Sequence, residues 1–193
     1  YLQDIPSIKK TLLSFHAKDD CPEVREKVFR TIVDFDFTAE LFVARKIQNI
    51  FNTSHHRNEN EFYFDLISKL FENKLHLAES NEIYFAVRGN RSRQIPLERA
   101  IQRATDTFES RCGKKVKSPI SIYPQSPFGE PCLQVIDYVN WAVQRAFIKG
   151  EARYYKFIES KIKYLVDLYD TDKYPRNHYS NRNKFDIEKI SPL

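Results

Sequence analysis

The chain has 193 residues, of which 41% are hydrophobic and 14% aromatic, and its formal net charge is +5. This composition lies far from that of a disordered chain and can bury a full core, so it predicts one globular domain over residues 1–193. No apolar run reaches the roughly 18 residues that a membrane span needs, and we expect no membrane partner. The excess of basic residues allows a polyanionic partner such as nucleic acid without requiring one.

The three cysteines, Cys21, Cys112 and Cys132, lie far apart and form no Cys-x-x-Cys pair. They predict neither a zinc knuckle nor a disulfide framework, and we expect a reducing, cytoplasmic environment. The sequence also lacks Walker phosphate-binding loops, Gly-x-Ser-x-Gly elbows and His-Glu-x-x-His helices, which excludes those enzyme classes.

The predicted elements alternate along the chain. Helical spacing of apolar residues predicts helices at 22–33, 59–71 and 96–112, and alternating patterns predict strands at 38–44, 82–87 and 120–123. A helix beginning near Leu133 and another near Tyr154 follow, and residues 170–193 form a polar tail. The alternation predicts an α/β fold with a mixed, largely parallel sheet flanked by helices. We expect strands 38–44 and 82–87 to be parallel neighbours, with the Leu133 helix packed on their sheet.

Basic residues follow two of the predicted strands. Arg45 and Lys46 follow the first, and three arginines between Arg88 and Arg93 follow the second. Parallel sheets bind ligands at the carboxyl ends of their strands, so Arg88 and Arg91 are candidate phosphate-binding residues. The alternative is a solvated loop.

Two titratable residues, Asp137 and His16, are the main candidates for site residues. On the Leu133 helix, whose buried face is predicted to include Ile136, Asp137 shares a second stripe with Gln134 and Trp141. The stripe predicts a carboxylate at the edge of a cleft, or a solvated residue near the helix start.

His16 is the second such position. It is followed by Lys18, Asp19 and Asp20, and its imidazole suits metal binding or proton transfer, with a purely structural role as the alternative. Asp19 and Asp20 are candidate metal ligands, and Asp20 could instead cap the helix at Pro22. The His55-His56 pair lies in a polar loop and is predicted to be solvent-exposed.

Two segments carry a resemblance to a known family. The run Leu133-Gln134-Val135-Ile136-Asp137-Tyr138, followed by Ala142 to Arg145, resembles the C-terminal signature of the domain of unknown function 3800 family. The run Phe15-His16-Ala17-Lys18-Asp19-Asp20, followed by Val24-Arg25 and Val28-Phe29, is similar to that family's Phe-His-Ala segment.

The resemblance implies a ribonuclease-H-like fold and a metal-dependent nuclease or phosphodiesterase using Mg²⁺ or Mn²⁺. Under it, Asp137 and His16 are the metal ligands and Asp19 assists catalysis. Gln134, Lys18, Arg88 and Arg91 would contact the substrate.

Two features depart from the family pattern. No Asp-x-Ser-Gly strand occurs, and Tyr1 to Ile8 is typical of the middle of a longer protein, so we expect the chain to be a fragment. Arg88 also stands where family members carry an acidic residue. These departures favour the alternative function, a non-catalytic module that binds nucleic acid or protein.

The tail's tyrosines and basic residues between Tyr174 and Lys184 could stack bases and neutralise phosphates, or simply pack on the domain.

Overall fold

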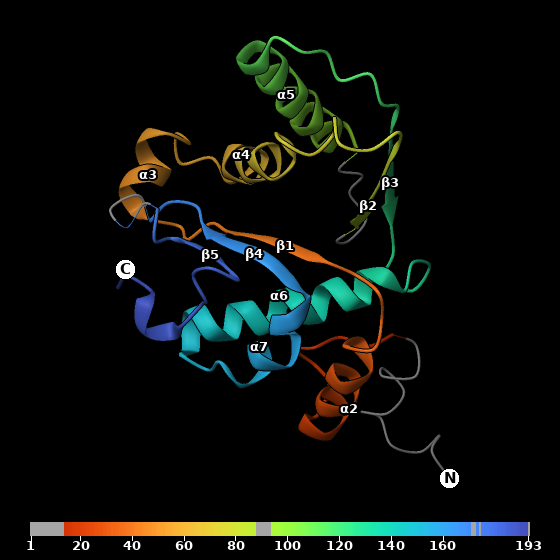
Figure 1. Ribbon diagram of the computed structural model, residues 1–193, viewed down its shortest axis with the longest axis vertical. Coiled ribbons are helices and arrows are strands. Elements are labelled where there is room, and N and C mark those ends of the chain that lie inside the picture. Colours follow the sequence, from red (N-terminus) through yellow and green to blue (C-terminus); the bar gives the residue numbers. More distant parts are fainter. Residues whose placement is uncertain (1–13, 88–93, 171–172, 174, 193) are drawn as a thin grey trace. The chain divides into compact units, whose positions relative to one another are not determined.

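The computed structural model describes residues 14–87, 94–170, 173 and 175–192 (Figure 1). The chain forms two compact units. The first unit contains the described residues up to 41 together with those of 126–166 and 170–192, and the second contains those of 42–125 and 167–169. The elements in chain order are α2 (Pro22–Ile32), β1 (Ala39–Val43), α3 (Gln48–Thr53), α4 (Glu59–Phe71), β2 (Asn81–Ala86), α5 (Gln94–Cys112), β3 (Ile120–Gln125), α6 (Cys132–Lys149), α7 (Arg153–Ile158), η1 (Glu159–Lys161), β4 (Ile162–Asp167), β5 (His178–Ser180) and η3 (Ile187–Lys189).

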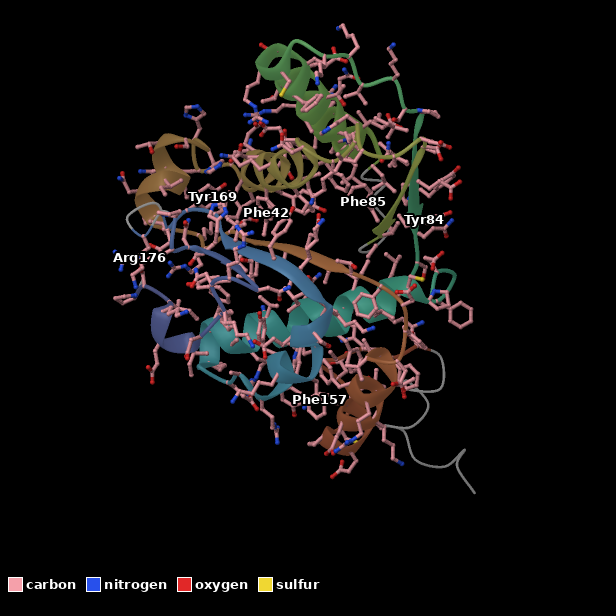
Figure 2. The ribbon with its side chains drawn as sticks, in the orientation of Figure 1. Phe42, Tyr84, Phe85, Phe157, Tyr169 and Arg176 are labelled. Carbon is pink, nitrogen blue, oxygen red and sulfur yellow. The ribbon has the colours of Figure 1, made fainter. Side chains whose placement is uncertain are left out.

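The first unit is organised around the buried ring of Phe29 on α2. Tyr138 of α6 meets this ring edge-on with centroids 5.1 Å apart, and Tyr154 of α7 lies 5.3 Å away. Phe157 stacks on the same ring at 5.8 Å (Figure 2). Because aromatic pairs add to the free energy of simple burial, these contacts join the three helices into one core.

Helix α6 provides the largest share of that core. Its buried residues are Leu133, Tyr138, Val139, Ala142, Val143 and Ala146. The predicted apolar face was wrong at Ile136, which is 48% exposed, because Tyr138 occupies the core instead. The helix ends at Gly150, whose φ of 62° is the left-handed conformation that favours glycine after a helix.

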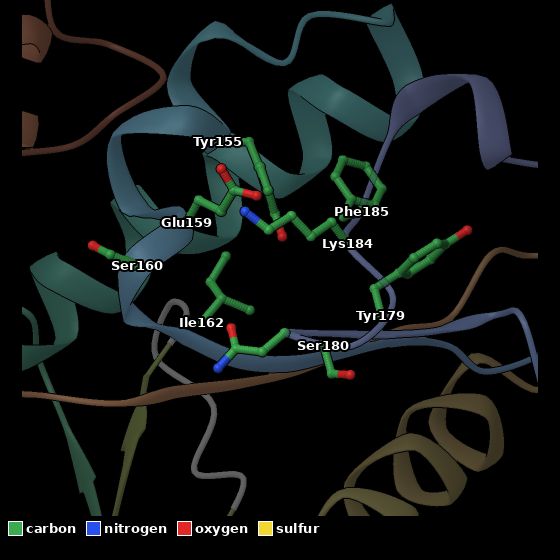
Figure 3. A pocket seen from close by; sticks show the side chains of 9 residues that line it. Tyr155, Glu159, Ser160, Ile162, Tyr179, Ser180, Lys184 and Phe185 are labelled. Atoms are coloured by element: carbon green, nitrogen blue, oxygen red, sulfur yellow. The ribbon is translucent and has the colours of Figure 1, made fainter.

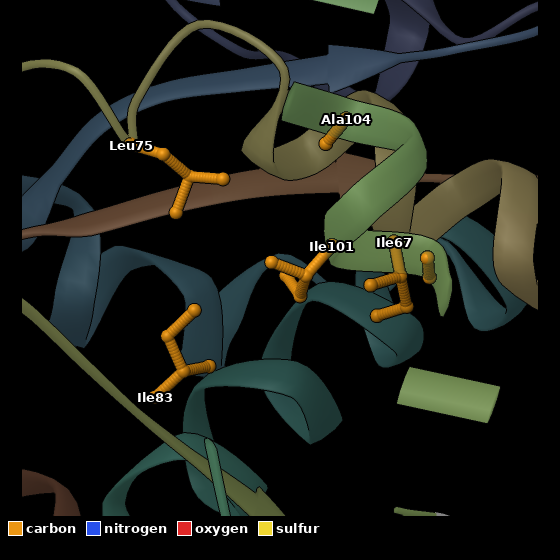
Figure 4. Close-up of a cluster of buried hydrophobic side chains, with 6 residues drawn as sticks. Ile67, Leu75, Ile83, Ile101 and Ala104 are labelled. Atoms are coloured by element: carbon orange, nitrogen blue, oxygen red, sulfur yellow. The ribbon is translucent and has the colours of Figure 1, made fainter. Parts of the chain in front are cut away.

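The second unit packs two helices against a two-stranded sheet. Strands β2 and β3 pair in parallel, with Ile83 opposite Ile122. Ile83 joins a buried cluster with side chains from α4 and α5, including Ile67, Ile101 and Ala104 (Figure 4). The other sheet face is exposed: the rings of Tyr84 and Tyr123 stack there with centroids 5.0 Å apart, whereas Phe85 faces the cluster (Figure 2).

The remaining strands form a separate sheet in the order β1-β4-β5, with β4 and β5 antiparallel. The mixed α/β class is confirmed, and the two-stranded sheet of β2 and β3 is parallel. The prediction that the strands near residues 38–44 and 82–87 are neighbours is wrong, because β1 and β2 belong to different sheets. One largely parallel sheet is therefore replaced by two small ones, and the ribonuclease-H-like fold stays a prediction.

Several element boundaries match their sequence signals. Helix α4 spans the predicted range, and the Asn58 side chain accepts hydrogen bonds from the N–H groups of Asn60 and Glu61 at its start. Gly113 closes α5 with a φ of 65°, the left-handed conformation that favours glycine after a helix. Within the described residues, no helix has the length and apolar character needed to cross a membrane.

Candidate functional site

A tight turn in the first unit presents His16. The N–H groups of Asp19 and Asp20 both donate to the His16 carbonyl oxygen, at 3.0 and 2.9 Å. The Asp20 carboxylate accepts from the His16 N–H at 2.9 Å and from the Tyr138 hydroxyl, and Asp20 is only 3% exposed. Asp20 therefore fixes the turn. The prediction that it caps the next helix is wrong, since α2 is preceded by Cys21 without a side-chain cap.

The buried tyrosine in this contact keeps its proton. Burial raises the pKa of Tyr138 far above its ordinary value, and the hydrogen bond to Asp20 and the charge of that carboxylate act in the same direction. The hydroxyl is thus a permanent donor to Asp20 at physiological pH.

Helix α6 holds the same turn through two side chains one helical turn apart. Gln134 Oε1 accepts from the Phe15 N–H at 2.8 Å, and Asp137 Oδ2 accepts from the Ala17 N–H at 2.9 Å. The Gln134 amide also donates to the Pro127 carbonyl oxygen at 2.7 Å. The two motifs that carry the family resemblance are therefore hydrogen-bonded to each other.

The His16 ring lies between two carboxylates. Its Nε2 is 3.9 Å from Asp137 Oδ1, and its Nδ1 is 3.7 Å from Asp19 Oδ2. The His16 side chain is 52% exposed and that of Asp137 32% exposed, so both are open to solvent. The predicted proximity of His16 and Asp137 is confirmed by this distance, while their chemical roles stay predictions.

Arg25 is a residue of this site that sequence reasoning missed as a functional candidate. Its Nε donates to the Ala17 carbonyl oxygen at 2.6 Å, and its guanidinium lies 4.9 Å from the centre of the Trp141 ring. Arg145 approaches the same ring at 5.6 Å. A cation held on an aromatic face is stabilised by the ring's quadrupole. Trp141 therefore stabilises the position of Arg25, and Arg25 in turn stabilises the turn that carries His16 through its hydrogen bond to Ala17.

The fit of a divalent metal to this site is incomplete. Mg²⁺ prefers several oxygen ligands in octahedral geometry, yet Asp137 uses one oxygen on the Ala17 N–H. The carboxylates of Asp19 and Asp137 face different nitrogens of one ring, so they do not converge with it on a single point. Over the described ranges, no group of three His, Cys, Asp or Glu side chains is arranged to hold a metal.

Of the four predicted substrate contacts, the structure describes Gln134 and Lys18. Gln134 is engaged with backbone, as described above, and Lys18 is exposed beside His16. Arg88 and Arg91 lie outside the described residues. Arg45, expected at an open strand end, instead forms an ion pair with buried Asp167 at 2.8 Å, and its side chain is 9% exposed.

The second unit contains a buried polar centre that the sequence did not reveal. Asp65 Oδ2 accepts from the Tyr169 hydroxyl at 2.9 Å and lies 3.3 Å from His55 Nε2. Lys69 and Arg103 each approach its carboxylate at 3.7 Å. His55 is 3% exposed, so its predicted solvent exposure is wrong; it packs edge-on against Phe62.

Comparisons with models of known protein families, with curated proteins and with solved structures found no match to this chain.

Proposed function

We propose that this chain is a phosphodiester hydrolase, of the nuclease type, with His16 and Asp137 at its reacting centre. The observation that carries the proposal is the placement of an open imidazole 3.9 Å from a carboxylate that a helix holds in position. A positioned imidazole suits proton transfer near neutral pH. Lys18, exposed two residues away, suits contact with a phosphate.

Mg²⁺ or Mn²⁺ is part of this proposal. Asp137 Oδ1 and His16 are the donors available to such an ion, and Mg²⁺ is commonly held by one or two carboxylates with water and substrate phosphate completing its shell. The ion would neutralise phosphate charge and activate water. The resemblance to the domain of unknown function 3800 family, with its ribonuclease-H-like fold, supports the same reading.

A binding module without catalysis is the second candidate. It is favoured by Asp137 Oδ2, which holds the Ala17 N–H and so gives this aspartate a structural task. Under this candidate the two motifs join the turn to α6, and the chain's excess of basic residues binds nucleic acid.

The test is cleavage of single- and double-stranded DNA and RNA, with Mg²⁺, Mn²⁺ or a chelator. Asp137→Asn is the informative variant, because its side-chain oxygen still accepts the Ala17 N–H while the charge is lost. We expect it to lose cleavage and keep its fold; His16→Gln should behave alike. His56→Gln, at an exposed histidine of the second unit, is the control. A wild type that binds but never cuts would support the binding module, and one that does neither would overturn both candidates.

A further inference from the structure

A small pocket opens in the first unit between α7, η1, β4 and the segment from β5 to Phe185 (Figure 3). Its volume is ≈ 210 Å³. Pockets for drug-sized ligands measure roughly 300–1,000 Å³, so this one accommodates a group the size of a single nucleobase. Neither His16 nor Asp137 lines it, and it is a site separate from the proposed reacting centre.

The floor of the pocket is apolar and well packed. Tyr155, Ile162 and Tyr179 are 5%, 8% and 2% exposed. The Phe185 ring lies 4.5 Å from that of Tyr155 and meets that of Tyr179 edge-on at 5.2 Å. The three buried side chains are thus packed in place, and the partly exposed Phe185 ring is the aromatic surface that a flat ligand could contact.

The Tyr155 hydroxyl is a polar group aimed into this apolar floor. The side chain is buried, and Figure 3 shows its oxygen directed toward the pocket. Among the described residues it has no hydrogen-bond partner. Burial raises the pKa of Tyr155 well above its ordinary value, with a further contribution from the charge of Glu159, so the hydroxyl stays protonated and able to donate. The hydroxyl oxygen itself remains accessible to water, and a bound acceptor would take the place of that water.

The rim adds one charge of each sign. Glu159 and Lys184 both line the pocket, and neither terminal group is paired within the part of the chain that the structure describes. The matching ligand has acceptors for Lys184 and the Tyr155 hydroxyl, and donors for the Glu159 carboxylate. It is also flat and largely apolar on its faces.

We propose that this pocket binds a guanine base. Guanine presents O6 and N7 as adjacent acceptors, which lysine recognises, and its N1–H and N2 amine form a pair of donors that suits a carboxylate. Adenine has an amine in place of O6 and lacks the N1–H, so it would offer Glu159 a single donor group instead of an adjacent pair and would give Lys184 no O6 acceptor. The proposal goes beyond the proposed hydrolase and stands even if the chain cuts no phosphodiester.

The test is calorimetric titration of the full chain with guanosine monophosphate and with the dinucleotide GpU, against AMP and ApU. We expect the guanine ligands to bind and the adenine ligands to bind about tenfold more weakly or not at all. Binding of both guanine ligands would indicate a site open to a strand, whereas binding of the mononucleotide alone would indicate a free nucleotide. Absence of guanine binding, or equal affinity for adenine, overturns the proposal.

Three variants connect any binding to this pocket. Glu159→Gln and Lys184→Gln should each weaken guanine binding about tenfold, while Lys156→Gln, an exposed cation on α7, should leave it unchanged. Tyr155→Phe should weaken binding about two- to tenfold with no loss of stability, because its hydroxyl lacks a partner in the free protein. If guanine binding is unchanged in Glu159→Gln, Lys184→Gln and Tyr155→Phe, the base binds elsewhere and the assignment to this pocket is wrong. Because Asp137→Asn abolishes cleavage only, failure of one proposal is distinguishable from failure of the other.

Discussion

The Tyr138 hydroxyl donates a hydrogen bond to Asp20 across 118 residues of sequence, and both side chains are buried. The same carboxylate oxygen accepts the His16 N–H. The tyrosine thus connects the core of α6 to the turn that presents the candidate imidazole. The Tyr138–Asp20 hydrogen bond is buried, whereas His16 and Asp137 are open to solvent. The contribution of this bond to the free energy of unfolding can therefore be measured independently of any reaction.

Tyr138→Phe should lower the free energy of unfolding by roughly 1–3 kcal/mol, since a buried carboxylate loses a donor while the apolar ring remains. Urea denaturation followed by circular dichroism measures the change. Tyr164→Phe, at another tyrosine of the same unit, is the comparison, since its hydroxyl donates to the partly exposed Glu40 at 3.2 Å. An unchanged midpoint for Tyr138→Phe would contradict the role of this bond in fixing the turn.

Stability should also decline steeply in alkali. Burial raises the pKa of Tyr138, Tyr155 and Tyr169, and carboxylates near each of them add to the shift. A raised folded-state pKa stabilises the fold fully below the unfolded value near pH 10, and this contribution is lost as the pH rises above it. Each such tyrosine should cost about 1.4 kcal/mol per pH unit in that range. Urea midpoints from about pH 8 to about pH 11 measure the slope, which Tyr138→Phe should reduce; a flat profile would contradict the prediction.

The helices were predictable because their signals are local. Helix α4 has its Asn58 cap and its apolar spacing within one short stretch of sequence. Strand β4 was missed because Ile162 to Asp167 follows α7 after only the three residues of η1, and a short apolar run does not distinguish strand from helix. The strand partners were also unpredictable, since β1 pairs with β4 far along the chain.

The contrast between local signals and long-range contacts also applies to the His16–Asp137 site and to the His55–Asp65 cluster. The meeting of His16 with Asp137 followed from the two family-like motifs, but the use of Asp137 on the Ala17 N–H could not be predicted from residue type. His55 sits in a stretch that is polar throughout, and its burial depends on Tyr169, 114 residues away. No local pattern carries that information.

Arg45 and Asp167 should behave as a coupled pair in the second unit. Their groups are 2.8 Å apart and almost fully buried. Arg45→Met should lower the free energy of unfolding by about 3–5 kcal/mol because it removes the cation that faces the fully buried Asp167 carboxylate. The double variant with Asp167→Leu should recover much of that loss, which chemical denaturation of the four proteins in the cycle measures. Additive losses would show that the two charges do not depend on each other.

Cys132 should react more slowly with alkylating reagents than its exposure suggests. A hydrogen bond to Glu130 raises the pKa of its thiol, with smaller contributions from burial and from the Glu130 charge. Because the thiolate is the nucleophile, a raised pKa lowers the reactive fraction at neutral pH. In the wild type the Cys132 N–H donates to Glu130 Oε1 at 3.1 Å. Glu130→Gln keeps a side-chain oxygen for this bond but removes the negative charge. The variant should therefore shift the pH profile of alkylation at Cys132 to lower pH. Peptide mass spectrometry after timed iodoacetamide treatment measures the rates, with the exposed Cys21 and Cys112 as internal controls. Equal acceleration at all three cysteines would indicate loss of structure, and an unchanged profile at Cys132 would remove Glu130 as the cause.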